Sequence, residues 1–205
     1  MEGVILIDRE PPAMTPTTTP TLETPRLLLL PLTLDDAVQA QPLFAHWEIV
    51  RHLASQVPWP FPPDGVHAFY RDTALPAMAR GDQWHWSIRT KTNPTQLIGS
   101  IALVAQPQPP GHVHNRGFWI GRPHQGRGYA TEAAIAATDF WFDTLGFPTL
   151  TVPKARANEP SRRISLSTGM TLLRTETHHF VSGPLPTDIW HLTAEQWRSH
   201  CKRRP

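Results

Sequence analysis

The sequence predicts a mixed α/β fold, and three observations lead to this prediction. The chain has 205 residues, of which 40% are hydrophobic and 18% charged, and this suits one domain with a sizeable core. Short apolar segments with alternating side chains are interspersed with longer segments whose apolar residues recur at helical spacing. Neither an internal repeat nor a change in composition divides residues 23–195. We therefore expect one domain over this range.

The two ends of the chain differ from this central range. Residues 1–22 pass from a short apolar run into a stretch rich in threonine and proline, which is typical of a flexible leader. Residues 196–205 are rich in lysine and arginine and are expected to form a frayed basic tail. A basic tail can contact nucleic acid, but the net charge of only +2 adds little support, so we expect no nucleic-acid partner.

Several classes of protein are excluded. The single cysteine, Cys201, cannot form an internal disulfide, which suits the reducing cytoplasm. The chain shows neither a signal peptide nor an apolar run long enough to span a membrane. His112-x-His114 and His178-His179 lack the further carboxylates or cysteines of a metal site. We therefore expect a cytoplasmic protein with neither a membrane partner nor a bound metal.

Turn residues and periodicity indicate the elements of the first half. A strand over 26–32 leads into a helix that begins near Leu34, with Thr33 as its N-cap. A second helix is expected over 65–80, with Phe69 facing the core.

The next elements are strands, followed by helices and strands in turn. Alternation over 84–90 predicts a half-buried strand, and Asn93-Pro94 turns it into a hairpin with 97–104. The remaining elements follow from the same signals: a strand over 112–121, a helix over 127–145 closed by Gly146, a strand over 149–152, a helix over 160–168 ended by Gly169, strands over 171–174 and 187–192, and a helix over 193–199.

A strand, a glycine-bearing turn and a helix start follow one another over 117–133. Gly126 and Gly128 have no Cβ, so the backbone there can approach a ligand closely. The unpaired amides and the dipole of the helix's first turn favour an anion, so the segment predicts a phosphate-binding site. It is neither a Walker loop, because Tyr129 follows the last glycine, nor a dinucleotide fingerprint, because Thr131 replaces the third glycine.

The residues of this turn resemble a known family. Gln125-Gly126-Arg127-Gly128-Tyr129-Ala130 matches Q/R-x-x-G-x-G/A, the acetyl-CoA pyrophosphate motif of the GNAT acyltransferases. The flanking Trp119-Ile120 and Ala130-Thr131-Glu132-Ala133 resemble the ribosomal-protein N-acetyltransferase (RimJ/RimL-like) branch. The element order is similar to that family over residues 24–192. The resemblance implies a single-domain GNAT fold, with a central mixed, mostly antiparallel sheet flanked by helices.

The resemblance also implies where acetyl-CoA, the cosubstrate, would bind. Main-chain amides of the turn would hold the pyrophosphate, and the residues concerned are Gln125, Gly126, Arg127, Gly128, Tyr129 and Ala130. Main-chain groups of Trp119 and Ile120, and the side chain of Asn158, would contact the pantetheine arm.

Two residues are candidates for the proton transfers. By its resemblance to RimL-like proteins, Ser161 would protonate or orient the departing thiolate. Asn158 and Ser161 equally suit the capped start of a helix. The acidic residue that many relatives carry before the strand is absent here, so His114 is our candidate base for the acceptor amine, with His85 as an alternative.

Together these observations predict an N-acetyltransferase that moves an acetyl group from acetyl-CoA directly to a primary amine. The amine belongs to a protein N-terminus or to a small molecule, and the stiff aromatic loop over 59–63 is expected to line its pocket. The resemblance is compatible with a homodimer. The alternative is a non-catalytic acyl-CoA-binding sensor or partner protein on the same fold, which the missing acidic base would favour.

Overall fold

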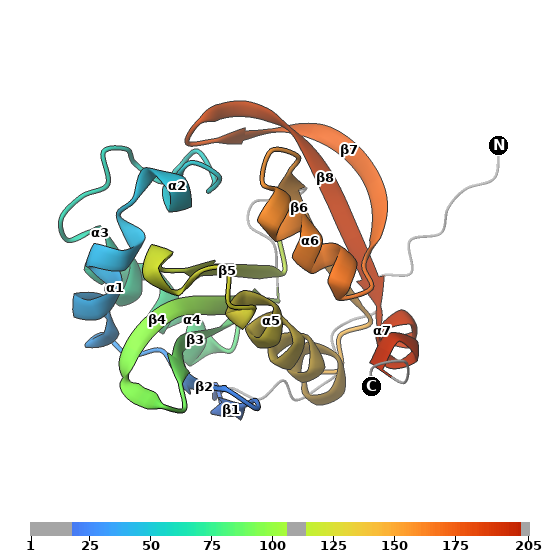
Figure 1. Ribbon diagram of the computed structural model, residues 1–205, viewed down its shortest axis with the longest axis horizontal. Helices are drawn as coiled ribbons and strands as arrows, with labels where there is room; N and C mark the ends of the chain where they lie inside the picture. The colour runs from blue at the N-terminus through green and yellow to red at the C-terminus, as the bar shows by residue number, and fades with distance from the viewer. Residues whose placement is uncertain (1–17, 106–113, 202–205) are drawn as a thin grey trace.

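The computed structural model describes residues 18–105 and 114–201, and it shows two β-sheets with helices on their faces (Figure 1). The larger sheet has the strand order β1 (Leu22–Glu23), β2 (Leu27–Pro31), β3 (Gln83–Thr90), β4 (Asn93–Val104) and β5 (Arg116–Ile120). The smaller sheet has the order β6 (Thr149–Ala155), β8 (Gly183–Thr193) and β7 (Thr171–Phe180). The predicted α/β class is confirmed, but the expected mixed sheet is divided in two, and each strand pair within the described residues is antiparallel.

Helices occupy most connections between the strands. Between β2 and β3 lie α1 (Asp36–Phe44), α2 (Trp47–Val50), and a long helix in which α3 (Gly65–Phe69) passes through a π turn (Tyr70–Ala74) into α4 (Leu75–Arg80). Helix α5 (Tyr129–Asp139), extended by a π turn (Phe140–Thr144), joins β5 to β6, α6 (Glu159–Ser167) joins β6 to β7, and α7 (Ala194–Cys201) follows β8. In the described ranges, every helix is too short or too polar to cross a membrane.

The two sheets meet at one point and separate beyond it. Directly before β5, the Asn115 N–H donates to the Thr151 carbonyl of β6 (2.9 Å), and the Asn115 side-chain oxygen accepts from the Thr151 N–H (2.8 Å). Past this junction, β5 and β6 are not paired along their described lengths. We call the two facing, unpaired edges of β5 and β6 the fork.

Strand β3 is buried on both faces. Trp86 packs against Phe140, at the end of α5, while His85 on the opposite face lies beside Phe69 of α3. The side chains of Trp86 and His85 are both buried. The expectation of a half-buried strand was therefore wrong, because β3 lies between β2 and β4 with helices over both faces.

The second predicted helix was placed correctly, and Met78 packs against the core, but Phe69 does not. Phe69, expected in the core, is 45% exposed, and the next residue, Tyr70, is buried instead. Pro76 has no N–H to donate to the carbonyl of Asp72, and the helix passes through its π turn just before this proline. The wider turn shifts the residues relative to an ideal helix, so simple periodicity assigned the wrong side chain to the core.

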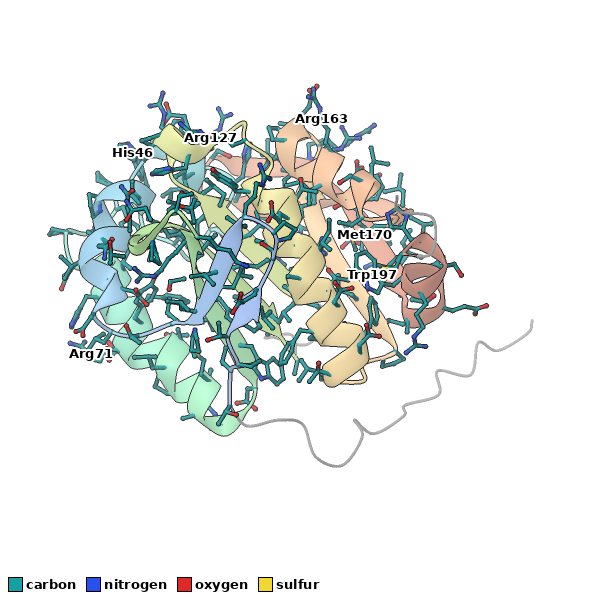
Figure 2. All side chains as sticks on the ribbon, turned by 60° about the horizontal axis from the view of Figure 1, so that its bottom comes forward. His46, Arg71, Arg127, Arg163, Met170 and Trp197 are labelled. Carbon is teal, nitrogen blue, oxygen red and sulfur yellow. The ribbon has the colours of Figure 1, made fainter. Side chains whose placement is uncertain are left out.

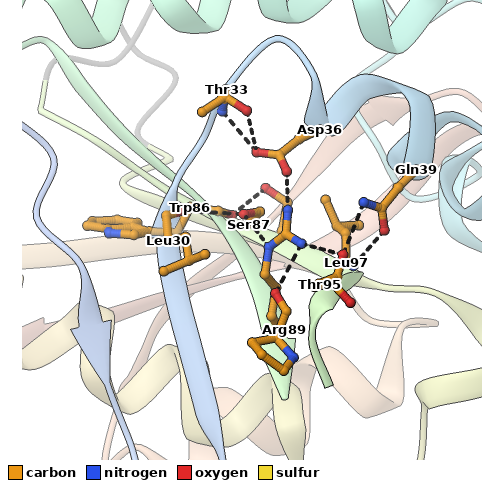
Figure 3. A network of polar contacts seen from close by, with 11 residues as sticks. Leu30, Thr33, Asp36, Gln39, Trp86, Ser87, Arg89, Thr95 and Leu97 are labelled. Carbon is orange, nitrogen blue, oxygen red and sulfur yellow. Dashed lines mark hydrogen bonds and ion pairs between the residues drawn. The ribbon is translucent and has the colours of Figure 1, made fainter. Parts of the chain in front are cut away.

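A buried ion pair attaches α1 to the larger sheet. Arg89 of β3 donates to one carboxylate oxygen of Asp36, at the start of α1, and to the carbonyl of Thr95 (2.7 Å) (Figure 3). The other Asp36 oxygen accepts from the N–H of Thr33 (2.9 Å). The N-cap is Asp35 rather than the expected Thr33, whose hydroxyl donates to the Asp36 carboxylate and does not accept from a helix amide.

The long β7–β8 hairpin arches across the molecule toward α2 (Figure 1). At its tip, Val181 N–H donates to the Leu53 carbonyl (3.0 Å) and Ser182 N–H to the Arg51 carbonyl (3.2 Å). We call residues 51–55 and 179–182 together the strap. Only parts of these strands were predicted, because the outer half of the hairpin is mostly exposed and lacks an apolar pattern.

Both expected flexible ends are partly attached to the core. The indole N–H of Trp86 donates to the carbonyl of Pro20 (2.6 Å), and residues 1–17 lie outside the described range. Trp197 in α7 is buried and donates to Asp139 (2.8 Å), so the helix predicted over 193–199 is confirmed and residues 196–201 belong to it rather than to the tail. Residues 202–205 lie outside the described range. A single buried tryptophan among polar residues gives too weak a periodicity to predict this packing.

Candidate active site

The turn between β5 and α5 has a backbone suited to an anion. Gly126 (φ 74°) and Gly128 (φ 79°) both adopt the left-handed conformation that glycine favours. A Cβ added at Gly126 would meet no atom within 4 Å, so the backbone there is open to a ligand. Gly128 is the N-cap of α5 and has no side chain to bond the first amides of the helix, which include those of Tyr129 and Ala130.

The side chains of this turn support its shape. Gln125 Nε2 donates to the carbonyl of Ile120 (2.8 Å), and Arg127 donates to the carbonyl of Pro123 (3.2 Å). Figure 2 shows Arg127 on the same side of the molecule as Arg163 of α6. The groups left for an anion are therefore mainly main-chain amides, as the sequence indicates.

Arg26, at the start of the domain, is a site residue that the sequence analysis missed. Its guanidinium pairs with Glu132 in the first turn of α5 (2.6 Å) and donates to the carbonyl of Arg127 (3.0 Å). It also lies over the ring of Tyr129, 5.0 Å from the centroid. The only local signal was a strand beginning with Thr-x-Arg-Leu, which does not show what the arginine contacts.

The register of β4 and β5 decides which main-chain groups face the fork. The carbonyl of Asn115 and the N–H of Gly121 bond to β4. Main-chain groups of an antiparallel strand point to alternate sides from one residue to the next, so Trp119, two residues before Gly121, also directs its groups to β4. Phe118 and Ile120 direct theirs to the fork. This corrects the expectation for the main chain of Trp119 and adds Phe118, which the sequence analysis had not singled out. The Trp119 ring packs against Phe44 on the α1 side.

The start of α6 brings two predicted residues together. Asn158 is the N-cap, and its side-chain oxygen accepts from the N–H of Ser161 (3.3 Å). Ser161 is buried, and its neighbour Arg162 pairs with buried Asp188 of β8 (3.0 Å), which anchors the helix start to the smaller sheet. The capping interpretation of Asn158 is thus confirmed, while its contact with pantetheine stays a prediction.

The glycine turn and the helix start that the sequence resemblance identified thus follow a strand, β5, whose other edge is not paired with β6. The family model that matches the chain is the acetyltransferase (GNAT) domain, and the match covers residues 26–171. The chain belongs to the GNAT acetyltransferase family.

Solved structures confirm the GNAT fold. The ribosomal-protein-S5-alanine acetyltransferase from Vibrio fischeri has a TM-score of 0.71 at 14% identity, covering 86% of this chain and 98% of that one. RimL, a ribosomal L7/L12 alpha-N-protein acetyltransferase solved with coenzyme A, has a TM-score of 0.70 at 12% identity, covering 85% and 98%. Spermidine N-acetyltransferase from Vibrio cholerae, solved with CoA and spermine, has a TM-score of 0.69 at 15% identity, covering 85% and 99%. At these identities the likeness establishes the fold alone. No curated protein sequence matches the chain.

The two candidate bases, His114 and His85, lie at different positions relative to the larger sheet. His114 lies just before β5, where its Nε2–H donates to the carbonyl of Arg116 (3.0 Å), leaving Nδ1 as the acceptor. Although the residue is exposed at the surface, desolvation and the nearby charge of Lys154 lower the pKa of His114, so the imidazole is neutral at pH 7. His85 is buried in β3, two strands from β5, and bonds to Gln83 (2.7 Å), so it is not a base for this site. His112 lies outside the described residues.

Two buried cations of this GNAT domain were also missed by the sequence analysis. Lys154 of β6 places its ammonium over the ring of Phe118, 4.8 Å from the centroid. Burial and the charge of Arg116 lower the pKa of Lys154 to about 7, and burial lowers the pKa of Arg116 to about 10. The predicted strand ended at Val152, so Lys154 had been left outside the sheet.

Metal ligands do not gather in the described residues. Within them, no group of three or more His, Cys, Asp and Glu side chains is arranged to hold an ion.

Proposed function

We propose that this GNAT protein transfers an acetyl group from acetyl-CoA directly to a primary amine in the cytoplasm, as a member of the RimJ/RimL-like branch. The observation that carries this proposal is the open glycine turn at Gly126 and Gly128, directly beside the fork. The turn offers amides to a pyrophosphate, and the fork offers unpaired strand edges to an extended arm. The residues present therefore suit acetyl-CoA.

The main chain supplies most of the binding groups. Amides of residues 126–130 hold the pyrophosphate, and Arg26 fixes the shape of their turn. The main-chain groups of Phe118 and the N–H of Ile120, together with Asn158, contact the pantetheine arm, while the Ile120 carbonyl accepts from Gln125. When bound, acetyl-CoA supplies a thioester, which is an acyl donor with a stable thiolate leaving group.

Ser161 and His114 act on opposite sides of the transfer. Ser161 donates a hydrogen bond to the sulfur, and its place at the capped start of α6 supports this role. His114 receives a proton from the acceptor amine through Nδ1, directly or through water. Its lowered pKa makes it a weak base that is already unprotonated at neutral pH.

The strap restricts the acceptor. Main-chain hydrogen bonds join residues 51–55 to residues 179–182, and the exposed rings of Trp47 and Trp59, which flank residues 51–55 in the sequence, pack together with their centroids 5.2 Å apart. A bridged entrance favours a small amine or the narrow end of an extended chain. We therefore propose a protein N-terminus or a small-molecule amine, the two acceptor classes named for the structural neighbours above.

The test is release of free thiol from acetyl-CoA with a panel of amines, including ribosomal-protein N-terminal peptides, amino acids and polyamines, against a blank without acceptor. Acceptor-dependent release is expected for one class. If calorimetry shows acetyl-CoA binding but none of the amines causes release, the non-catalytic sensor becomes the better explanation. If acetyl-CoA does not bind, the proposed role of the glycine turn is wrong.

A further inference from the structure

Lys154 projects from β6 across the fork onto β5. Its Nζ lies 4.8 Å from the centroid of the Phe118 ring. Asn115 and Thr151 form the junction where the two strands meet, and Phe118 and Lys154 each lie three residues beyond it on their own strands. The ammonium group is therefore inside the fork, toward its closed end.

The nearest acid in the sheet does not neutralise this lysine. Lys154 and Asp188 are opposite each other in the β6–β8 register, so their side chains leave the same face. The Asp188 carboxylate instead pairs with Arg162 (3.0 Å) and Arg156 (3.5 Å). The ion pairs formed within the described ranges do not include Lys154, whose head group turns to an aromatic face.

The charged groups around Lys154 leave the fork positive. Arg116 of β5 is fully buried and donates to Thr138 and to the carbonyl of Ala134, neither of which carries a charge. His114, before β5, is neutral at pH 7. Asp188 is already paired with two arginines, and burying further cations with which no acid pairs is costly unless an anion joins them during function. The fork is therefore suited to negative charge that appears inside it.

We propose that Lys154 is the proton donor to the departing thiolate of CoA. This inference rests on the proposed function, because it requires the thioester to lie in the fork. As the acceptor nitrogen bonds to the acetyl carbon, the C–S bond breaks and its electron pair stays on sulfur. His114 takes the first proton, which leaves the acceptor ammonium before attack. Lys154 Nζ then gives one proton to the sulfur and takes up the second proton, which the nitrogen releases after it has bonded to the acetyl carbon. The lysine returns to its starting state, and atoms and charge balance.

The chemistry favours lysine over serine for this proton. A thiol titrates near 8.5, so transfer from an ammonium whose pKa is about 7 runs downhill. A serine hydroxyl is a far weaker acid than this ammonium. Ser161 then keeps the role of a hydrogen-bond donor that orients the sulfur, and it approaches from α6, which follows Lys154 directly in the chain.

The test is to measure the thiol pKa of CoA bound to the protein. The ultraviolet absorbance of the thiolate reports the titration, and the complex with desulfo-CoA serves as the blank. A cation beside the sulfur should lower this pKa by about 1 unit relative to free CoA, which still leaves the thiol a weaker acid than the Lys154 ammonium. Lys154→Met should return it to the free value, while Lys154→Arg should keep it low. Lys91→Met, which removes an exposed lysine paired with Glu23 (3.1 Å), is the matched control and should behave as wild type.

The turnover of the Lys154 variants then distinguishes a role of the positive charge from a role in proton transfer. Lys154→Arg should bind CoA normally but lose most turnover, since guanidinium does not release its proton at neutral pH. A normal thiol pKa in the wild-type complex, or full turnover in Lys154→Arg, overturns the proposal. If Lys154→Met does not fold, the thiol pKa of the wild-type complex and the turnover of Lys154→Arg still test the proposal. Absence of CoA binding by wild type in calorimetry would reject the proposed function and this inference together, whereas binding with an unshifted thiol rejects only the inference.

Discussion

Arg26 and Glu132 are separated by 106 positions in the sequence, yet their side chains form a charged hydrogen bond of 2.6 Å beside the glycine turn. Glu132 also accepts from the hydroxyl of Thr24 (2.6 Å), and Arg26 donates to the carbonyl of Arg127 (3.0 Å). The start of β2 is thereby joined to both the turn and the first turn of α5. The shape of the proposed CoA site thus depends on a segment far from its motif.

Arg26→Met should weaken acetyl-CoA binding by about tenfold, because it removes a charge-assisted hydrogen bond worth about 1.5 kcal/mol that holds the turn. Calorimetric Kd values measure the effect. Arg71→Met, which breaks an exposed pair with Asp72 on the α3–α4 helix, should leave binding unchanged. Equal Kd values for Arg26→Met and wild type would mean that the turn holds its shape without this arginine.

Gly126→Ala should reduce both stability and binding. The added Cβ meets no neighbour, so the loss of stability comes from the left-handed backbone and should be about 1–2 kcal/mol. The same Cβ would stand where the backbone meets the pyrophosphate, so the acetyl-CoA Kd should rise.

Gly183→Ala is the matched control for this change. Gly183, at the hairpin tip, also has a positive φ (101°) and open space around its Cβ position. It should lose similar stability in urea unfolding but keep the wild-type Kd. Equal Kd values for both variants would contradict a binding role for Gly126.

Asp36→Asn and Arg89→Met should each destabilise the fold by about 3–5 kcal/mol, because each leaves a buried charge unpaired. The double variant should lose less than the sum, since neither charge then remains alone. Urea unfolding of the four proteins gives the coupling energy. Strict additivity would show that the pair is not coupled. Arg80→Met, which breaks an exposed pair with Asp82, should cost under about 1 kcal/mol.

His85 should make stability depend on pH. Burial lowers its pKa to about 4, against about 6.5 in an unfolded chain. Between these values the unfolded state binds a proton that the folded state does not, so stability falls as the pH drops from about 6.5 to about 4. His85→Gln cannot take up this proton, so it should lose less stability than wild type between about pH 7 and about pH 5. Identical losses in urea unfolding would show that His85 does not contribute.

The elements predicted well from the sequence are those set by neighbouring residues. Gly146 (φ 72°) and Gly169 (φ 74°) end their helices as expected, and the hairpin at Asn93 is present, although its second strand begins earlier. The glycine turn was also located correctly, because left-handed backbone and an uncapped helix start depend on a few consecutive residues. Phe69 was misplaced because a π turn interrupts the regular spacing on which its prediction depended.

The sequence by itself determined the α/β class, the family and the position of the glycine turn, since these depend on short-range backbone preferences and on the order of elements. Only the tertiary structure placed Lys154 on Phe118, joined Arg26 to Glu132 and turned the main chain of Phe118, rather than Trp119, toward the fork. These relationships depend on strand register and on how distant segments pack. A shift of one residue in register would reverse which groups face the fork, and no local pattern in the chain records that choice.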